Sequence, residues 1–268
     1  MNHIVYISSE PKILLRGKEV TKKLIVAIVL SIALLSADCF AVVPAFAKPD
    51  NPGPPDIELK IFIHYAKSKP KPPQEDAGYF KLIGAKWKTL PVQLEVNPSN
   101  PDGLSEAFVV TAVHLAAEEW DDGAYSGWVG VTCNLFADSI IVNHNIEYGD
   151  LAWTSDKRDG KNTLLWGDYP TSGVIAVTLL WYNRATKTIL EFDIVFDTDY
   201  DWSDATVTAS TMDLQNIATH ELGHGAGLDD VYQSTAYQET MYGYSYVGDT
   251  AKRDLYTGDK AGITKLYG

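Results

Sequence analysis

Residues 220–230 read HELGHGAGLDD, a spacing that is typical of a metal site. Residues four apart lie on the same face of an α-helix, so His220 and His224 would project side by side and could share one ion. Glu221 lies one residue round the helix, where it can reach a metal-bound water without being a ligand. Zinc lowers the pKa of such a water to about 7, so a neighbouring carboxylate can accept its proton. The motif therefore predicts a Lewis acid, a nucleophile and a base within one helical turn.

The alternative to a metal site is a solvent-facing helix that carries two histidines by coincidence. From residue frequencies, an HExxH match should arise by chance in about one chain in a hundred of this length. Here the match follows a strongly apolar segment and lies on a predicted helix with candidate N-caps at Ser210 and Thr211. This context favours the metal site.

A catalytic zinc site needs three protein ligands and one open position. No histidine follows His224, so the third ligand cannot be a later histidine. Gly227 can adopt a positive φ and turn the chain back, which would return Asp229 and Asp230 toward the two imidazoles. Glu239 is a competing carboxylate, but it would need a second long helix, which the turn-forming residues after 227 disfavour.

The elements that must position this motif form an α+β pattern rather than a regular βαβ alternation. Alternating or continuous apolar runs predict strands, and apolar residues at helical spacing predict helices. We expect strands over 92–96, 173–182 and 189–196, and helices over 104–120, from about 210 to 225, and over 258–267. On the first of these helices the predicted apolar face consists of Leu104, Phe108, Val109, Ala112, Leu115 and Ala116.

The motif resembles the extended zinc motif of metzincin metalloproteases, HExxHxxGxxH/D. The resemblance implies that His220, His224 and Asp230 are the zinc ligands, and it favours Asp230 over Asp229. It also implies that Glu221 is the catalytic base. The position of the usual third histidine is taken by aspartate, as in some metzincins.

Further segments resemble the matrixin branch of the metzincins, from about residue 78 to 268. ETMYGY (239–244) is similar to the Met-turn, a tight bend in which Met241 would form a hydrophobic floor beneath the metal. The other similar segments are GAKWKTLPVQLEVNP, ILEFDIVFDTDYDWS, STMDLQNIATHELGH and DKAGITKLYG. The resemblance implies a metzincin-like catalytic domain, with a mixed twisted sheet, two long helices, a Met-turn and a C-terminal helix.

The resemblance implies a secreted zinc-dependent endopeptidase that hydrolyses peptide bonds with a zinc-bound water and Glu221 as general base. The strand near 173–182 would border the cleft and pair with an extended protein or peptide substrate. The alternative from another class is a non-catalytic zinc-containing surface or binding module. Glu221 argues against it, because holding a metal does not require that residue.

Two other family features bear on this sequence. Matrixins often carry structural calcium, and the carboxylates available for it are Asp193, Asp197, Asp199 and Asp201. A solvated acidic turn is the competing interpretation of this cluster. The cysteine that gives matrixins their latency has no counterpart between the signal sequence and the domain, which leaves the latency mechanism open.

The first 77 residues divide into a predicted secretory signal peptide (1–47) and a Pro-rich linker or short pro-segment (48–77). Lys22 and Lys23 precede an apolar run at 24–35, and AFA (45–47) suits a signal peptidase. An uncleaved membrane anchor is the alternative. Within 48–77, IELKIFIHYA alternates like a strand, either a remnant of a pro-segment or an edge strand, with His64 expected to be exposed.

The chain of 268 residues carries a formal charge of −13, which disfavours nucleic acid as a partner. Its two cysteines are Cys39, inside the predicted signal, and Cys133, so no disulfide framework is expected. We expect Cys133 to be a small buried apolar residue. We also expect a secreted monomer without stable membrane association once the signal is removed.

Overall fold

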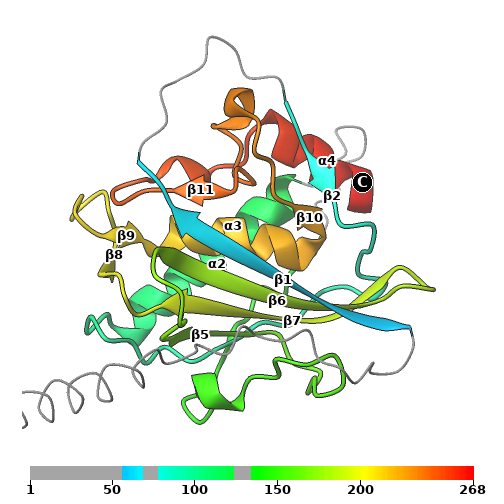
Figure 1. Cartoon of the computed structure of the whole chain (residues 1–268), viewed down its shortest axis with the longest axis horizontal. Helices are drawn as coiled ribbons and strands as arrows, with labels where there is room; N and C mark the ends of the chain where they lie inside the picture. Colours follow the sequence, from blue (N-terminus) through cyan, green and yellow to red (C-terminus); the bar gives the residue numbers. More distant parts are fainter. Residues whose placement is uncertain (1–55, 69–77, 124–133) are drawn as a thin grey trace, which may run out of the picture. The chain divides into compact units, whose positions relative to one another are not determined.

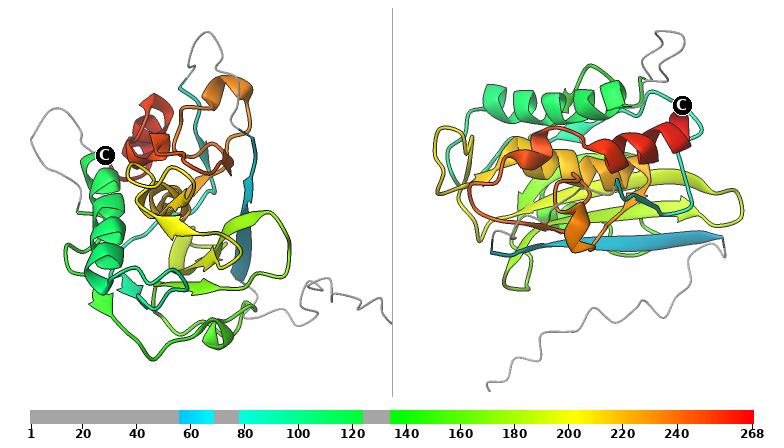
Figure 2. Two further views of the ribbon diagram at one scale, coloured as in Figure 1. Left: turned by 90° about the vertical axis from the view of Figure 1, so that its left-hand side faces the viewer. Right: turned by 90° about the horizontal axis from the view of Figure 1, so that it is seen from above.

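The computed structural model describes residues 56–68, 78–123 and 134–268. Within these ranges a mixed sheet carries three helices on one side, as the two views in Figure 2 show. The strands of this sheet, in spatial order, are β11 (Tyr244–Ser245), β1 (Ile57–Ala66), β6 (Val174–Asn183), β7 (Thr188–Asp197), β5 (Thr163–Gly167), β3 (Glu95–Val96) and β4 (Ile141–Val142). The predicted α+β class with a mixed sheet is confirmed.

The sheet combines parallel and antiparallel neighbours. The pairs β3–β4, β3–β5, β5–β7 and β1–β11 are parallel, whereas β6 runs antiparallel to both β7 and β1 (Figure 1). Because β6 is flanked by two long antiparallel partners, its ladder extends over the whole strand. Four short strands form two further pairs: β2 (Lys81–Leu82) with β10 (Leu228–Asp229), and β8 (Trp202–Ser203) with β9 (Met212–Asp213).

The predicted strands and helices are present, with changed ends. The strand expected over 92–96 shortens to β3, while β6 and β7 match the two apolar runs within one or two residues. The helices are α2 (Glu106–Gly123), α3 (Leu214–Ala226) and α4 (Thr257–Tyr267). The prediction that Leu115 belongs to the buried apolar face of α2 is wrong, because this residue is 44% exposed.

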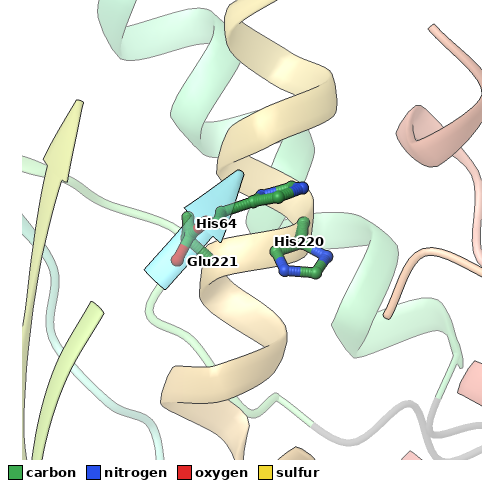
Figure 3. Close-up of side chains that lie close together, drawn as sticks. All are labelled: His64, His220 and Glu221. Atoms are coloured by element: carbon green, nitrogen blue, oxygen red, sulfur yellow. The ribbon is translucent and has the colours of Figure 1, made fainter. Parts of the chain in front are cut away.

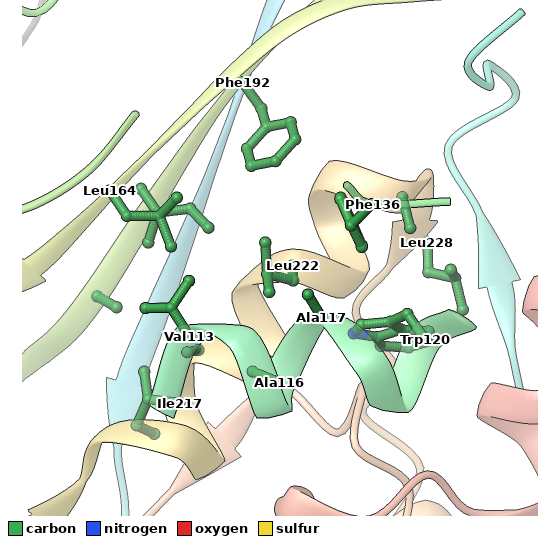
Figure 4. Packing of buried hydrophobic residues seen from close by; sticks show 14 of the residues in the cluster. Val113, Ala116, Ala117, Trp120, Phe136, Leu164, Phe192, Ile217, Leu222 and Leu228 are labelled. Carbon is green, nitrogen blue, oxygen red and sulfur yellow. The ribbon is translucent and has the colours of Figure 1, made fainter. Parts of the chain in front are cut away.

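The main core lies between the sheet and the helices. Figure 4 shows Trp120 and Val113 of α2, Leu222 of α3 and Phe192 of β7 in this layer. Trp120 is fully buried, and its indole N–H donates to the carbonyl of Thr219 at 2.8 Å. The apolar ring and its satisfied N–H tie α2 to α3, which carries the metal motif.

Two sequence predictions fall outside the described residues: the signal peptide at 1–47 and the burial of Cys133. Among the residues with a described structure, no helix combines the length and the apolar character needed to cross a bilayer. The segment IELKIFIHYA lies inside the described part and forms β1.

Candidate active site

The helix α3 carries the motif, and both of its ends are fixed by local interactions. The side chain of Asp213 is the N-cap, accepting the N–H of Asn216 at 2.8 Å. The helix therefore begins after Asp213 and not at Ser210 or Thr211, because residues 212–213 pair with β8. At the other end Gly227 has φ of 112°, as predicted, and its N–H donates to carbonyls of the last turn.

The two histidines of α3 are held in one orientation by backbone carbonyls. His220 Nδ1 lies 2.7 Å from the carbonyl oxygen of Thr240, and His224 Nδ1 lies 3.0 Å from that of Leu228. A carbonyl only accepts, so each Nδ1 must be the donor and each Nε2 keeps its lone pair. Burial lowers the pKa of both rings, that of His220 to about 3 with help from the charge of Lys252. Both imidazoles are thus neutral, the form that ligates metals.

The turn at Gly227 brings Asp230 back to the two rings. Its Oδ1 lies 3.3 Å from His220 Nε2 and 3.6 Å from His224 Nε2. Tyr232 donates to Oδ2 at 3.0 Å and so fixes the carboxylate.

These residues fit a zinc ion. His220 Nε2 and Asp230 Oδ1 are buried and lack any hydrogen-bond partner in the described part of the chain. Lone pairs from three side chains therefore converge without a proton between them, an arrangement that a cation would stabilise. Ligands of a tetrahedral zinc, each about 2.0–2.1 Å from the ion, stand about 3.4 Å apart, close to the separations from Asp230. His220, His224 and Asp230 could hold a metal.

The other carboxylates considered from the sequence have different partners. Asp229 Oδ2 pairs with the ammonium groups of Lys60 and Lys81, each at 2.8 Å. Glu239 accepts the N–H groups of Gly258 and Asp259 at the start of α4, about 3.0 Å away. Neither carboxylate joins the two imidazoles in a group that could hold an ion among the described residues.

Glu221 is fully buried beside the metal-ligand group. Its Oε2 accepts from the hydroxyl of Thr178 on β6 at 2.6 Å, and its Oε1 lies 3.0 Å from His64 Nδ1. Burial raises the pKa of Glu221 to about 8. The carboxylate faces β1, the neighbour of β6 in the sheet, and Figure 3 shows it beside the imidazoles of His64 and His220.

The expectation that His64 is exposed is wrong. Only 2% of this residue is accessible, because its face of β1 lies against α3 and not against solvent. Its ring packs against that of His220 with centroids 3.9 Å apart. The alternation in IELKIFIHYA predicted a strand but gave no sign that the face with His64 is the one that packs against α3.

Two more residues of the site were not identified from the sequence. Lys252 is buried, and its ammonium donates to the carbonyl of Tyr242 and lies 3.2 Å from His220 Nδ1 and 3.4 Å from His64 Nε2. Thr178 lies in the middle of an apolar strand, where a hydroxyl is out of place unless it has a partner. That polar position inside GVIAVTLLWY was the one available signal.

Met241 lies beneath the motif, at the position that the Met-turn resemblance implied. It is fully buried, and a methyl group built on Gly223 would overlap its sulfur and the ring of Trp120. Asp259 of α4 accepts the N–H groups of Thr240 and Met241 at 2.6 and 3.0 Å. The last helix thus fixes the bend whose Thr240 carbonyl orients His220.

The acidic residues considered for calcium separate into two places. Asp197 and Asp199 join Asp168 in a group whose oxygens lie within 4.8 Å of one another. Asp193 is buried beside Glu191 in a different cavity, and Asp201 joins neither group. Calcium binding at these places stays a prediction.

Comparison with known proteins agrees with this geometry. The model of the matrixin family matches residues 177–268, which contain α3, the Met-turn and α4. Matrix metalloproteinase-25 of Mus musculus is 23% identical over 192 residues, covering 70% of this chain. The alignment spans 28% of the length of that relative. The motif, the fold and these similarities support the assignment of this chain to the matrixin-like metzincins.

Proposed function

We propose that the chain is a zinc-dependent endopeptidase, with His220, His224 and Asp230 as zinc ligands and Glu221 as general base. The observation that carries the proposal is the convergence of two neutral Nε2 atoms and one unpaired carboxylate oxygen beside a buried glutamate. Glu221 separates the proposal from a zinc-holding module without turnover, because a purely structural site has no use for a base there.

A zinc ion held by these residues would supply the Lewis acid that activates water and polarises the scissile carbonyl. Glu221 would accept the proton of the attacking water on a carboxylate oxygen and pass it to the nitrogen of the leaving amine as the C–N bond breaks. Thr178 would orient that carboxylate through Oε2, and the carbonyls of Thr240 and Leu228 would keep both imidazoles in the ligating tautomer.

The proposed substrate is an extended protein or peptide segment. The long strand β6 supplies Thr178 to the base and could offer its main chain to such a segment. Export from the cell through the signal at 1–47, a catalytic domain over 78–268 and a monomeric state belong to the same proposal. The matrixin similarity supports an extracellular peptidase in general terms.

The test is the hydrolysis of casein by purified, zinc-loaded protein, with and without a chelator. Glu221→Gln should keep one equivalent of zinc, because the ligands are untouched, and lose hydrolysis by at least about a hundredfold. Glu118→Gln, a half-exposed carboxylate on α2, is the matched control and should hydrolyse casein like the wild type.

An unchanged rate in Glu221→Gln would remove Glu221 from the reaction. Zinc binding with no hydrolysis, in the wild type and in the β1 variants described below, would instead favour the non-catalytic module.

A further inference from the structure

Strand β1 occupies the place that a substrate would take under the proposed function. It pairs antiparallel with β6 from Ile57 to Tyr65, and its last two residues pair parallel with β11. β6 therefore has β7 on one side and β1 on the other. Without β1, one edge of β6 would carry unpaired main-chain groups, the kind of surface to which extended peptides add.

One face of β1 contacts the metal motif residue by residue. Lys60 and Phe62 are two residues apart and therefore lie on the same face of β1, where they contact the C-terminal half of the metal motif. The ammonium of Lys60 lies 2.8 Å from Asp229 Oδ2. The ring of Phe62 stacks on that of His224, with centroids 3.9 Å apart and planes at 13°. The strand thus covers one of the two candidate histidine ligands with an aromatic ring.

The next residue on this face covers the base. Both oxygens of Glu221 are engaged, one by Thr178 and the other by His64. Thr178 belongs to β6 and would stay with the site, whereas His64 belongs to β1. Glu221 is fully buried and His64 is 2% exposed, so water does not reach the carboxylate while β1 is bound.

The pairing of β1 with β6 shifts between His64 and Tyr65, the point where the strand passes the base. Such a bulge re-aims a side chain relative to the regular ladder. The opposite face of β1 packs as well, with Leu59 against the cluster that contains Trp181 and Ile63 against Val174 and Val177. The strand is therefore held by both faces and by its main chain.

We propose that residues 57–66 are a resident, substrate-like occupant of the position between β6 and β11, and that they hold the peptidase at a low residual activity, with His64 blocking Glu221. The proposal rests on the proposed function. It supplies the latency that the sequence could not explain with a cysteine, because the blocking group is an imidazole on a paired strand. Activity would then begin when β1 leaves β6.

The experiment uses the full chain with Glu58→Pro, compared with Glu58→Ala. The N–H of Arg184 donates to the carbonyl of Asp56, so in the alternating antiparallel ladder Glu58 and Tyr182 form the next hydrogen-bonded pair. Proline at this position removes a main-chain N–H of the ladder, whereas alanine keeps the ladder and removes only a half-exposed side chain. Cleavage of a quenched fluorescent peptide should rise at least about tenfold in Glu58→Pro, which corresponds to about 1.4 kcal/mol of lost docking. Glu58→Ala should stay near the wild-type rate.

Hydrogen exchange provides a readout that does not depend on turnover. The amides of β6 should lose protection in Glu58→Pro and keep it in Glu58→Ala, while those of α2 stay protected in both variants. His64→Ala tests the block with the strand in place, and it should raise the rate with little change in β6 exchange. It also keeps the proposal testable if the proline variant fails to fold.

The outcomes separate the two proposals. Equal rates in the wild type, Glu58→Pro and His64→Ala, with the β6 amides exposed in the proline variant, would overturn the proposed latency and leave the proposed peptidase activity unaffected. If no variant hydrolyses peptide, the proposed peptidase activity is wrong. Binding of a fluorescent IELKIFIHYA peptide then tests separately whether β1 is a displaceable occupant of this position. That peptide should bind Glu58→Pro and not the wild type, and equal binding to both would overturn the occupancy.

Discussion

His64 Nδ1 lies 3.0 Å from Glu221 Oε1, although 157 residues separate the two along the chain. The contact joins a strand that precedes the matrixin-like segment (about residues 78–268) to the residue that the motif marks as the base. It exists because β1 adds to the sheet next to β6, whose own Thr178 contacts the other oxygen of Glu221. The site and the segment before the domain thus form one packed unit.

Asp230→Ala should lose zinc during dialysis, whereas Asp229→Ala should keep it. Asp230 presents an unpaired oxygen to both imidazoles, while Asp229 is paired with Lys60 and Lys81 on the far side of the turn. Metal content per chain, measured by elemental analysis after dialysis, decides between them. Equal retention in the two variants would contradict the assignment of Asp230.

Gly223→Ala should destabilise the fold by about 1–3 kcal/mol, since the new methyl overlaps Met241 and the fixed ring of Trp120. Alanine would otherwise improve a helix interior by up to about 1 kcal/mol, so the sign depends on this crowding. Gly149→Ala is the control, because its methyl would meet no atom within 4 Å. Urea unfolding of both variants gives the comparison, and a Gly223→Ala midpoint at or above the wild type would contradict the packing.

The metal-free protein should lose stability as pH rises from about 4 to about 8. Burial raises the pKa of Glu191 to about 7 and that of Asp193 to about 8, while Asp159 and Glu95 add negative charge near Asp193. In the unfolded chain such carboxyls have a pKa of about 4, so the folded state binds more protons across this window. The free energy of unfolding therefore falls with increasing pH.

Asp193→Asn removes a carboxyl that binds one of these extra protons in the folded state, while its amide oxygen can still accept the N–H of Thr163. Its stability should fall less steeply between pH 5 and pH 8 (roughly the window set by these pKa values) than that of the wild type. Asp138→Asn, an exposed carboxylate, should follow the wild-type slope. Parallel slopes for all three proteins would show that Asp193 is ionised throughout.

Calcium should raise the melting temperature if the carboxylates of Asp168, Asp197 and Asp199 bind it, because a ligand that binds only the folded state stabilises that state. Asp197→Asn should reduce the shift, since Asp197 is the buried member of the group. Magnesium is the control, because it demands a stricter octahedral geometry. An equal shift in the wild type and in Asp197→Asn would place calcium at another site. No shift in either protein would exclude calcium binding.

The sequence alone determined those parts of the protein that depend on local spacing. Helix periodicity places two histidines four residues apart on one face, and a left-handed turn at the glycine three residues later can return a carboxylate to them. The candidate ligands and the candidate base were therefore predicted from residues 220–230. Apolar runs likewise predicted β6 and β7, because burial within a sheet leaves a recognisable apolar pattern in the sequence.

Only the tertiary structure decided which distant groups meet at the site. Nothing local to His64 or Lys252 indicates a contact with the motif, and Thr178 shows only a polar position inside an apolar strand. These contacts depend on strand register and on the position of Ala251–Arg253 beside α3. Register is set by the packing of both faces of a sheet, and a shift of one residue would turn His64 away from Glu221. The chemistry of the motif is thus a local property, while the covering of its base by β1 is a property of the folded chain.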